Sequence, residues 1–340
     1  MKPQLSIGLI GAGRIGRIHA ANLAHRIPGA SLRAVADVDR PAARSCADQY
    51  GASASYEDYR ELLSSNEVDA VVVSSSTDTH ADIVEAAAQA GKDVFCEKPI
   101  SLDLQAIGRA MEAVRRAGVQ LQVGYNRRFD PNFRRLRDAV RTGEIGTPHL
   151  LHIISRDPAP PPIEYVRRSG GLFVDMTIHD FDMARFLIGE EVVEVFAAAG
   201  VRVDPAIGEA GDVDTAIVTL KFEKGTIGTI DNSRQAVYGY DQRAEVFGSL
   251  GSIRTGNNFP NAAFVSGSSG IRRDPPLHFF VERYQESYVE ELRAFIEAIR
   301  DEMPVPVTGE DGRASVVMGL AARRSYEENR PVRLQEIEAS

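Results

Sequence analysis

Cysteine is scarce in this chain of 340 residues, which contains only Cys46 and Cys96. Two cysteines are too few for a disulfide framework or a zinc cluster, and we expect both to be small buried hydrophobic residues. Long apolar runs are also absent, since no stretch approaches the roughly 18 residues that span a bilayer. Residues Met1–Gln4 lead directly into the first predicted strand and leave no room for a signal peptide. We therefore expect a cytoplasmic protein that binds no membrane.

Positive charge is in short supply as well. Lysine and arginine number 39 against 48 aspartate and glutamate, which gives a formal net charge of -9. This balance, without a basic cluster interleaved with aromatic residues, argues against a nucleic-acid surface. The densest basic stretch, Arg127–Arg135, is either a solvated helix face or a neighbour of an anionic cofactor. The length and the hydrophobic content of 43% predict two ordinary globular domains.

The most informative segment joins a predicted strand, a glycine-rich turn and a predicted helix. The strand Leu5–Ile10 leads into Gly11, Gly13 and Gly16, and a helical apolar pattern follows. The glycines permit a tight turn, close approach of the backbone to a pyrophosphate, and close packing of the helix on the strand. Asp37 follows a second strand, about 20 residues beyond the last glycine, where an acid meets the adenosine ribose. This arrangement predicts a binding site for NAD.

Strands and helices alternate along the first part of the chain, up to about residue 124. The strands are short and uniformly apolar, which is typical of parallel strands buried on both faces. Right-handed crossovers between them give a doubly wound α/β sheet, a Rossmann fold, over residues 1–125. The expected strands are Leu5–Ile10, Leu32–Ala36, Ala70–Val73, Asp93–Cys96 and Gln120–Val123.

The pattern changes in residues 126–340. Segments of alternating apolar and polar residues dominate, and turn signals such as Gly225 separate them. They predict an α+β domain built on a largely antiparallel open sheet, which binds substrate and mediates oligomerisation. Two helices come last, and they lie in this domain or pack back on the first one. The expected strands are His149–Ser155, Val192–Val203, Asp214–Phe222, Gly225–Asp231, Arg243–Phe247 and Ser252–Arg254, and the last helices are Tyr284–Arg300 and Asp311–Asn329.

Ligands of doubly wound sheets bind beyond the carboxyl ends of the strands, where four loops of this chain should meet. One of them, Ser74–Thr77, suits contacts to ribose or phosphate, and equally suits a plain solvated turn. For His80, which follows, a role in starting the next helix is favoured over catalysis. The expected cofactor-binding residues are Gly11, Gly13, Arg14, Ile15, Gly16, Asp37, Ser74, Ser75, Thr77, His80 and Glu97.

Lys98 is a candidate for chemistry at the same edge of the sheet. It follows the fourth expected strand and precedes Pro99, which restricts the turn. A partly desolvated amine that faces a nicotinamide cation can orient or deprotonate a hydroxyl group. The alternative is an ordinary surface lysine at a strand end.

A second constellation runs from Gly170 to Asp182 and contains Asp175 and His179. The two residues are four apart, which predicts that they share one face of a helix. A carboxylate beside an imidazole fixes its tautomer and supports its charged form, as a general base for an alcohol requires. The alternatives are a helix-surface pair without function, and a metal site that lacks a visible third and fourth ligand.

Four motifs together resemble one known family. They are the loop Gly11–Gly16, the turn Glu97–Pro99, the segment Asn126–Asp130 and the run Gly170–Asp180. In combination they are similar to the glucose–fructose oxidoreductase/inositol dehydrogenase/MocA (Gfo/Idh/MocA) family, over nearly the whole chain. The motifs are specific to the type of reaction and much less specific to the sugar.

Within that family, segments 152–158 and 232–243 look most like those of inositol 2-dehydrogenases. The resemblance implies NAD-dependent oxidation of the axial hydroxyl of myo-inositol to a ketone. The catalytic residues that it implies are Lys98, Asp175 and His179. The substrate-binding residues that it implies are Lys98, Arg127, Asp157, Asp175, His179 and Tyr240.

The resemblance further implies a homotetramer formed through the open face of the second sheet, because a large exposed apolar sheet face needs cover. Asp37 favours NAD over NADP by repelling a 2′-phosphate, whereas Arg14 and Arg40 could partly neutralise that repulsion. Two other functions stay open. One is an NAD(P)-dependent dehydrogenase or reductase of a pyranose or anhydrosugar, and the other is a sugar or NAD sensor without catalysis.

Overall fold

The computed structural model describes residues 4–339. By their internal packing they form two compact units, Met1–Phe129 with Glu286–Val316, and Asp130–Gln285 with Val317–Ser340. The division of function expected at residue 125 stays a prediction. The expectation that no signal peptide precedes the first strand concerns Met1–Pro3, which lie outside the described residues. Within the described residues, no helix combines the length and the apolar character that a bilayer crossing requires.

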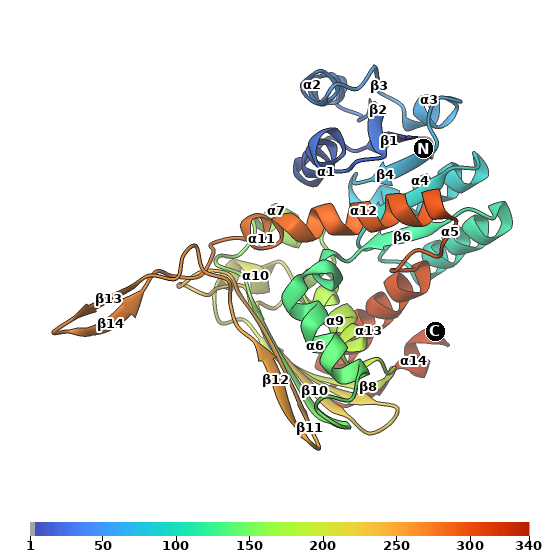
Figure 1. Ribbon diagram of the computed structural model, residues 1–340. Helices are drawn as coiled ribbons and strands as arrows, with labels where there is room; N and C mark the ends of the chain where they lie inside the picture. Colours follow the sequence, from blue (N-terminus) through green and yellow to red (C-terminus); the bar gives the residue numbers. More distant parts are fainter. Residues whose placement is uncertain (1–3, 340) are drawn as a thin grey trace. The chain divides into compact units, whose positions relative to one another are not determined.

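The first unit contains a six-stranded parallel sheet in the order β3-β2-β1-β4-β5-β6 (Figure 1). All five expected strands are confirmed, two with the expected ends and three with ends shifted by one or two residues. The short edge strand β3 was not expected, because its polar sequence Ala54-Ser55-Tyr56 gives no apolar run. The strands are β1 (Leu5–Ile10), β2 (Ala30–Ala36), β3 (Ala54–Tyr56), β4 (Ala70–Val73), β5 (Asp93–Glu97) and β6 (Leu121–Gly124).

Helices connect these strands, and aspartate side chains cap several of them. Asp39 and Asp103 each accept a hydrogen bond from a backbone N–H of the first helical turn, which satisfies a group that the helix leaves unpaired. Gly51 and Gly118 end their helices in the left-handed conformation. The connecting helices are α1 (Arg14–His25), α2 (Arg40–Tyr50), α3 (Tyr59–Leu63), α4 (Thr77–Gln89) and α5 (Leu104–Ala117), with the 3₁₀ turn η1 (Asn126–Phe129) after β6.

Helix α12 (Gln285–Asp301) completes the first unit, although it lies far along the chain. Its Leu292 and Phe295 belong to the same buried apolar cluster as Ile7 and Leu9 of β1. Helix α13 (Gly309–Glu328) contributes residues to both units, since the boundary falls after Val316. The two last expected helices are therefore confirmed, and the first of them packs on the parallel sheet.

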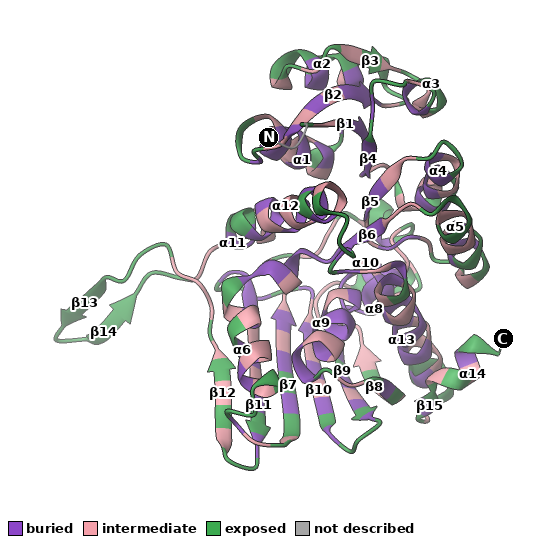
Figure 2. Ribbon diagram, turned by 45° about the vertical axis from the view of Figure 1, so that its right-hand side comes forward, coloured by how far each residue is buried: buried purple, intermediate pink, exposed green. Residues whose placement is uncertain are grey.

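The second unit contains a seven-stranded sheet in the order β12-β11-β7-β10-β9-β8-β15. All pairs are antiparallel except β7 with β10, so the expected open, largely antiparallel sheet is confirmed. Helices α6 (Pro131–Arg141) and α9 (Ile178–Ile188) lie over one face (Figure 2). The strands are β7 (Pro148–Arg156), β8 (Val192–Gly200), β9 (Thr215–Phe222), β10 (Ile227–Ser233), β11 (Asp241–Gly248), β12 (Gly251–Thr255) and β15 (Val332–Arg333).

A two-stranded hairpin of β13 (Phe264–Gly267) and β14 (Gly270–Arg273) projects from the second unit (Figure 1). Every residue of both strands is exposed. The sequence did not predict this hairpin, because glycine, serine and proline dominate the surrounding segment and no alternation marks the strands. The remaining helices are α7 (Ile163–Val166), α8 (Gly171–Asp175), α10 (Pro205–Glu209), α11 (Phe280–Arg283) and α14 (Leu334–Glu338).

Candidate active site

The three glycines of the β1–α1 loop serve different purposes in the structure. A Cβ on Gly16 would lie 1.9 Å from the Gly11 carbonyl oxygen, and one on Gly11 would lie 2.5 Å from the Ser75 backbone nitrogen. Both are therefore required by packing of the protein itself. A Cβ on Gly13 would meet nothing within 4 Å. The space above this exposed glycine is therefore open. In the dinucleotide motif the backbone approaches the pyrophosphate at this position.

Helix α1 begins at the residues expected to face the phosphates. Gly13 is its N-cap and makes no side-chain capping bond, so the first N–H groups of the helix are not satisfied by a cap. Arg14 is exposed and Ile15 half-buried at the first two helical positions. Unsatisfied N–H groups and the positive end of the helix dipole suit an anionic ligand.

Asp37 lies directly after β2 and is bound to the glycine loop. Its Oδ2 accepts a hydrogen bond of 2.7 Å from the backbone N–H of Ala12, and its Oδ1 accepts one of 2.8 Å from Asp39. The carboxylate is half-exposed. The structure thus holds the predicted ribose acceptor against the predicted phosphate loop by a contact within the first unit.

The loop after β4 is ordered by its own hydroxyl groups. Ser74 Oγ donates to the carbonyl oxygen of Gly11 at 3.0 Å, and Ser75 Oγ lies 2.7 Å from the hydroxyl of Thr79. Thr77 is half-buried at the start of α4. The loop therefore lies beside the glycine loop, as a second ribose- or phosphate-binding segment must.

His80 connects two loops. Its Nδ1 lies 2.9 Å from the carbonyl oxygen of Pro99, and its Nε2 lies 3.0 Å from that of Ser75. The residue is buried, with 2% of its surface exposed, and each ring nitrogen faces a backbone oxygen. This placement makes His80 a brace between the β4–α4 loop and the turn after β5, and it leaves neither ring nitrogen open to a cofactor.

The turn Glu97–Pro99 extends from β5, and the structure separates the tasks of its first two residues. The Glu97 carboxylate points inward and lies 2.7 Å from Nε2 of the buried His19. Lys98 follows and is half-buried, at the carboxyl end of the sheet where catalytic groups were expected. Glu97 is therefore placed to support the turn, whereas Lys98 lies at the sheet edge where the sequence predicted a catalytic group.

Arg127 follows the neighbouring strand in the same way. Glu97 of β5 pairs with Gly124 of β6, so the residues after these two strands share one edge of the sheet. Arg127 lies in η1 and is buried, with 5% exposed. Beside it, Arg128 forms an ion pair of 3.0 Å with Asp311. The first unit thus brings Lys98 and Arg127 to the ends of adjacent strands.

Asp175 in the second unit is held by residues that its sequence neighbourhood does not reveal. Tyr165 donates its hydroxyl to Oδ1 at 2.8 Å, and Arg234 donates from Nη1 to Oδ2 at 3.0 Å. Arg234 is almost fully buried. Burial and the Asp175 charge raise the pKa of Tyr165 well above its ordinary value, which keeps the phenol a donor. The carboxylate is therefore fixed in place and balanced by a buried cation.

The expectation that Asp175 and His179 share a face of one helix is wrong. Helix α8 ends at Asp175 and α9 begins at Ile178, so the helix is interrupted between them. The backbone N–H of Thr177 donates to the carbonyl of Leu172 at 2.9 Å, five residues back, instead of continuing the regular pattern. Gly170, the N-cap of α8, and Gly171, its first residue, both have positive φ, so the chain also changes direction there.

His179 lies in the first turn of α9, and residues on either side of it are fixed by Asn232 of β10. Asn232 Oδ1 accepts from the Thr177 hydroxyl at 2.6 Å, and its Nδ2 donates to Oδ2 of Asp180 at 2.9 Å. Thr177, Asp180 and Asn232 are all fully buried. This network secures the start of α9 to the sheet while the imidazole of His179 remains half-exposed.

The two remaining expected substrate ligands lie in the second unit at different depths. Asp157 follows β7, and its Oδ2 is 3.8 Å from Nη1 of Arg234, so it belongs to the Asp175 group. Tyr240 is buried, and its ring packs edge-on against Tyr284 with the centroids 6.0 Å apart. The structure thus joins Asp157 to Asp175 through Arg234, and it places Tyr240 in the interior of the second unit beside Tyr284.

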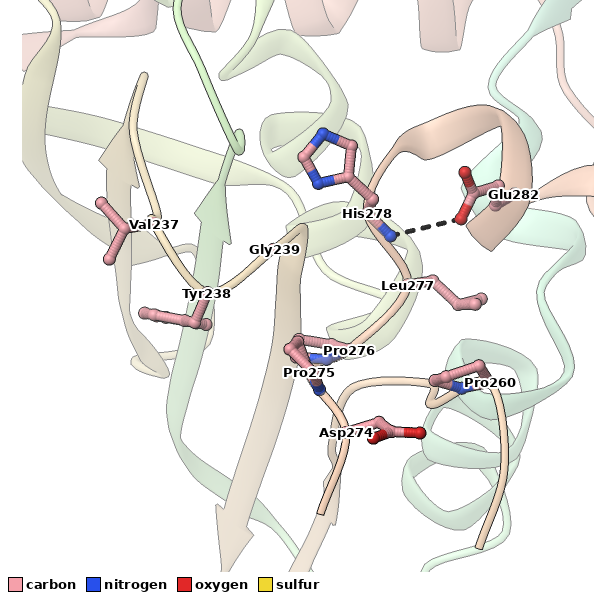
Figure 3. Close-up of a pocket in the computed structure, with 10 residues that line it drawn as sticks. All are labelled: Val237, Tyr238, Gly239, Pro260, Asp274, Pro275, Pro276, Leu277, His278 and Glu282. Atoms are coloured by element: carbon pink, nitrogen blue, oxygen red, sulfur yellow. Dashed lines mark hydrogen bonds between the residues drawn. The ribbon is translucent and has the colours of Figure 1, made fainter. Parts of the chain in front are cut away.

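A pocket of about 420 Å³ lies elsewhere in the second unit, at the base of the β13–β14 hairpin (Figure 3). Leu277, three prolines and the backbone of Gly239 form much of its wall, and the N–H of His278 donates to Glu282 at 3.3 Å. None of the expected site residues lines it. The carboxylate and imidazole side chains of its lining belong to Asp274, Glu282 and His278.

Three residues of the second unit were missed by sequence reasoning, Tyr165, Arg234 and Asn232. Arg234 and Asn232 lie in the segment that resembles inositol dehydrogenases, but nothing in their spacing relates them to Asp175. β10, which pairs with β7 and β9, contains Asn232 and leads into Arg234. Their contacts with Thr177 and Asp175 arise only in the folded sheet. Arg234 stands out as a candidate site residue only once the structure shows that it is buried.

The residues of the first unit fit a dinucleotide. Open space over Gly13, an uncapped helix start and an acid beside the glycine loop are the features that NAD binding requires. The residues of the second unit fit acid–base chemistry on a hydroxyl group. An imidazole that is held in position and a carboxylate whose charge is balanced are suited to moving a proton.

Comparison with known proteins gives consistent findings. The family model of an oxidoreductase family with an NAD-binding Rossmann fold matches residues 5–125, and the Gfo/Idh/MocA C-terminal domain model matches residues 133–254. A myo-inositol 2-dehydrogenase of Thermotoga maritima is 52% identical over 98% of this chain and 99% of its own. An inositol 2-dehydrogenase of Rhizobium meliloti is 47% identical, over 96% and 98%. A solved scyllo-inositol dehydrogenase of Lactobacillus casei, with NAD(H) and scyllo-inositol bound, has a TM-score of 0.92 at 32% identity, over 98% and 99%.

Proposed function

This chain belongs to the Gfo/Idh/MocA family of NAD-binding oxidoreductases, and we propose on that basis that it is an inositol 2-dehydrogenase. It oxidises a secondary hydroxyl of a cyclic polyol with NAD, and its first-choice substrate is myo-inositol, converted to 2-keto-myo-inositol. The observation that carries the proposal is the grouping of Asp175, Arg234 and Asp157 beside His179's helix. That grouping occurs in a chain whose relatives of the same length include inositol dehydrogenases.

NAD would be held by the glycine loop Gly11–Gly16, by Asp37 and by the loop Ser74–Thr77, and when bound it supplies the hydride acceptor. His179 accepts the proton of the substrate hydroxyl while the carbinol carbon gives up its hydride, so the alcohol becomes a ketone. Asp175 supports the imidazolium that forms, and Lys98 orients the reacting hydroxyl. The protein contributes position and charge to the reaction.

A site with several fixed polar groups favours a polyol over a simpler alcohol. Arg127, Asp157 and Tyr240 are the proposed ligands of the hydroxyls that do not react. A substrate that lacks one of these hydroxyls leaves a buried polar group unpaired, which lowers its kcat/KM strongly. Selectivity among inositol stereoisomers therefore depends on which of these three residues each hydroxyl can reach.

The experiment that tests the proposal is a screen of NADH formation. The purified protein is incubated with NAD and, separately, myo-inositol, scyllo-inositol, glucose, xylose and an anhydrosugar. We expect the highest kcat/KM with myo-inositol. The highest value with an aldose would replace the proposal by a pyranose dehydrogenase, and binding of NAD or sugar without turnover of any compound would identify a sensor.

We also propose that the protein is a homotetramer that assembles through the open face of the second sheet. Three apolar side chains lie side by side across neighbouring strands on that face, Leu150, Ile227 and Phe247. All three are exposed, as is Ile217 on β9. A contiguous apolar patch of this kind on a sheet face marks an interaction surface. Contact between this patch and the same patch of a second copy gives a symmetric assembly.

Light scattering during size-exclusion chromatography measures the mass of the assembly directly. We expect four chains for the wild type and a smaller assembly for Ile227→Glu. Ile271→Glu, on the exposed hairpin, is the matched control and is expected to leave the mass unchanged. A monomeric wild type would refute the assembly.

Cys46 and Cys96 are both free and buried, which accords with the proposed cytoplasmic location.

A further inference from the structure

A group of ionisable side chains is buried in the first unit behind the turn that carries Lys98. His19 comes from α1, Glu97 from the end of β5 and Glu291 from α12. One ligand-type atom from each lies within 4.8 Å of those of the others. His19 and Glu291 have no exposed surface, and the Glu97 side chain is 13% exposed. The mechanism proposed above uses none of the three, so their burial needs a separate explanation.

Two of these groups form a close pair. Nε2 of His19 and Oε1 of Glu97 are 2.7 Å apart, the distance of a charge-assisted hydrogen bond. That separation leaves no room for a metal ion between the two atoms, since the ligand atoms of one ion lie farther apart. Rings of Phe95 and Tyr288 pack edge-on against the imidazole and keep water from it. His19 and Glu97 therefore form a buried hydrogen-bonded pair and are not two ligands of one metal ion.

Glu291 lies beside this pair without a donor. Among the described residues neither of its carboxylate oxygens receives a hydrogen bond, although both are buried. The nearby amide of Gln122 donates to the backbone carbonyl of Glu291 at 2.7 Å and not to the carboxylate. A charged carboxylate in such surroundings is strongly disfavoured, whereas a neutral carboxylic acid is tolerated.

The charges around Glu291 act in the same direction. Burial, and after it the negative charge of Glu97, raise the pKa of Glu291 well above its ordinary value. Tyr288 from α12 and Cys96 from β5, whose thiol pKa is also raised by burial, are titratable groups that lie against the cluster. A neutral Glu291 adds no further charge to the buried His19–Glu97 pair.

We propose that Glu291 is protonated at neutral pH and donates its proton toward Glu97, so that the three side chains form a proton-sharing cluster that positions the Lys98 turn. Glu97 directly precedes Lys98, and its carboxylate also packs against Gly124 at the end of β6. A Cβ on Gly124 would lie 3.1 Å from Cδ of Glu97. The cluster thus fixes the ends of both strands after which Lys98 and Arg127 follow.

The opposite side of the turn is fixed by His80, which contacts the Pro99 carbonyl. Lys98 therefore lies between two supports, the cluster at Glu97 and the His80 brace at Pro99. Glu291 is a positioning residue in this account, since it acts only through Glu97. Its effect on turnover rests on the proposed dehydrogenase function, whereas its protonation does not.

Infrared difference spectroscopy tests the protonation itself. We expect the folded wild type at neutral pH to show the carbonyl stretch of a protonated carboxylic acid, and Glu291→Gln to lack it. Glu290→Gln, a neighbour on the same helix that pairs with Arg293, is the control and should keep the band. Loss of the band when the wild type unfolds at the same pH gives a test that needs no variant. A wild type without the band at neutral pH would refute the proposal.

Stability against pH supplies a second measurement. A carboxyl whose pKa is raised by folding stabilises the folded state most below its unfolded pKa of about 4.3. That stabilisation is lost as pH rises toward the folded pKa. We expect the wild type to lose stability over this range and Glu291→Gln, which cannot ionise, to lose less. Equal pH dependence in both proteins, or stoichiometric metal in the purified wild type, would contradict a proton-sharing cluster.

Activity separates positioning from mere packing. Glu291→Ala should lower kcat by roughly ten- to a hundredfold, because displaced catalytic groups cost that much. Glu291→Gln keeps the shape and the donor and should restore most of the loss, while NAD affinity changes little in either variant. Failure of Gln to rescue a folded protein would contradict the positioning role. If the wild type oxidises no polyol or sugar, the proposed function is refuted. The infrared experiment still tests the protonation of Glu291 independently.

Discussion

The glycine loop of the first unit and the Asp175–His179 segment of the second are built from different kinds of contact. Around the glycine loop the partners are backbone atoms at the ends of adjacent parallel strands, such as the Ala12 N–H that Asp37 binds. Around Asp175 the partners are side chains from other elements, Tyr165 before α8 and Arg234 after β10. A cofactor loop of this kind depends on backbone shape, whereas the acid–base group depends on side chains brought together by the sheet.

This difference has a consequence for substitution. A cofactor loop tolerates changes of side chain wherever the backbone remains open, and it fails where a Cβ cannot fit. The acid–base group fails through loss of charge balance or of a hydrogen bond, even where the backbone is untouched. Variants in the two regions should therefore separate NAD binding from turnover.

The largest effect is expected for His179→Ala. Removal of the general base should lower kcat by roughly 10²–10⁴. NAD affinity, measured by calorimetry, should change by less than about twofold, because the expected NAD ligands lie in the first unit and His179 in the second. The wild-type rate should rise with pH as the base loses its proton, and this rise should disappear in the variant. Near-normal turnover of His179→Ala would transfer the role of base to Lys98.

The second effect concerns the buried cation beside Asp175. Arg234→Gln leaves Asp175 and Asp157 without their positive partner, and breaking a buried ion pair in this way costs about 3–5 kcal/mol of stability. We expect a lower melting temperature and a lower kcat with little change in NAD affinity. Arg234→Lys restores the charge but not the planar fork, so it should recover only part of both.

Arg272→Gln, on the exposed hairpin, is the matched control for loss of an arginine. It should change neither the melting temperature nor the rate. An Arg234→Gln protein as stable and as active as the wild type would show that the second site does not depend on side-chain partners.

The third prediction concerns two glycines of one loop. Gly13→Ala places its Cβ in open space, so the protein should fold normally. The methyl group should nevertheless weaken NAD binding about tenfold or more, equivalent to ~1.4 kcal/mol. Gly16→Ala collides with the Gly11 carbonyl and should destabilise the loop itself, as thermal unfolding would report. Unchanged NAD affinity in a folded Gly13→Ala protein would place the pyrophosphate elsewhere.

The smallest effect is expected at Asp37. Asp37→Asn removes a charge that repels a 2′-phosphate, and charges about 4 Å apart in water interact by ~1 kcal/mol. The ratio of kcat/KM for NADP to that for NAD should therefore rise about fivefold. Asp39→Asn, at the cap of α2, is the control and should leave the ratio unchanged. A wild type that already prefers NADP would overturn the role of Asp37.

The sequence predicted most of the first unit and less of the second for the same reason. Gly11, Gly16 and Asp37 act through contacts of the local backbone, so their spacing was sufficient evidence. The helix break between Asp175 and Ile178 was not predicted, because a spacing of four is equally compatible with an unbroken helix. Tyr165 and Asn232 were missed since only sheet pairing relates them to the site, and α12 joined the first unit through packing that periodicity does not specify.

In the proposed reaction a ring carbon of inositol gives up its hydride, for which NAD would be the acceptor, as His179 takes the hydroxyl proton. Myo-inositol deuterated at carbon 2 tests it in a single-turnover experiment. We predict that deuterium appears in the reduced cofactor at C4 of the nicotinamide, and that the deuterated substrate reacts more slowly than the ordinary one. Formation of a ketone with the deuterium released to water, or no reduced cofactor at all, would contradict the account.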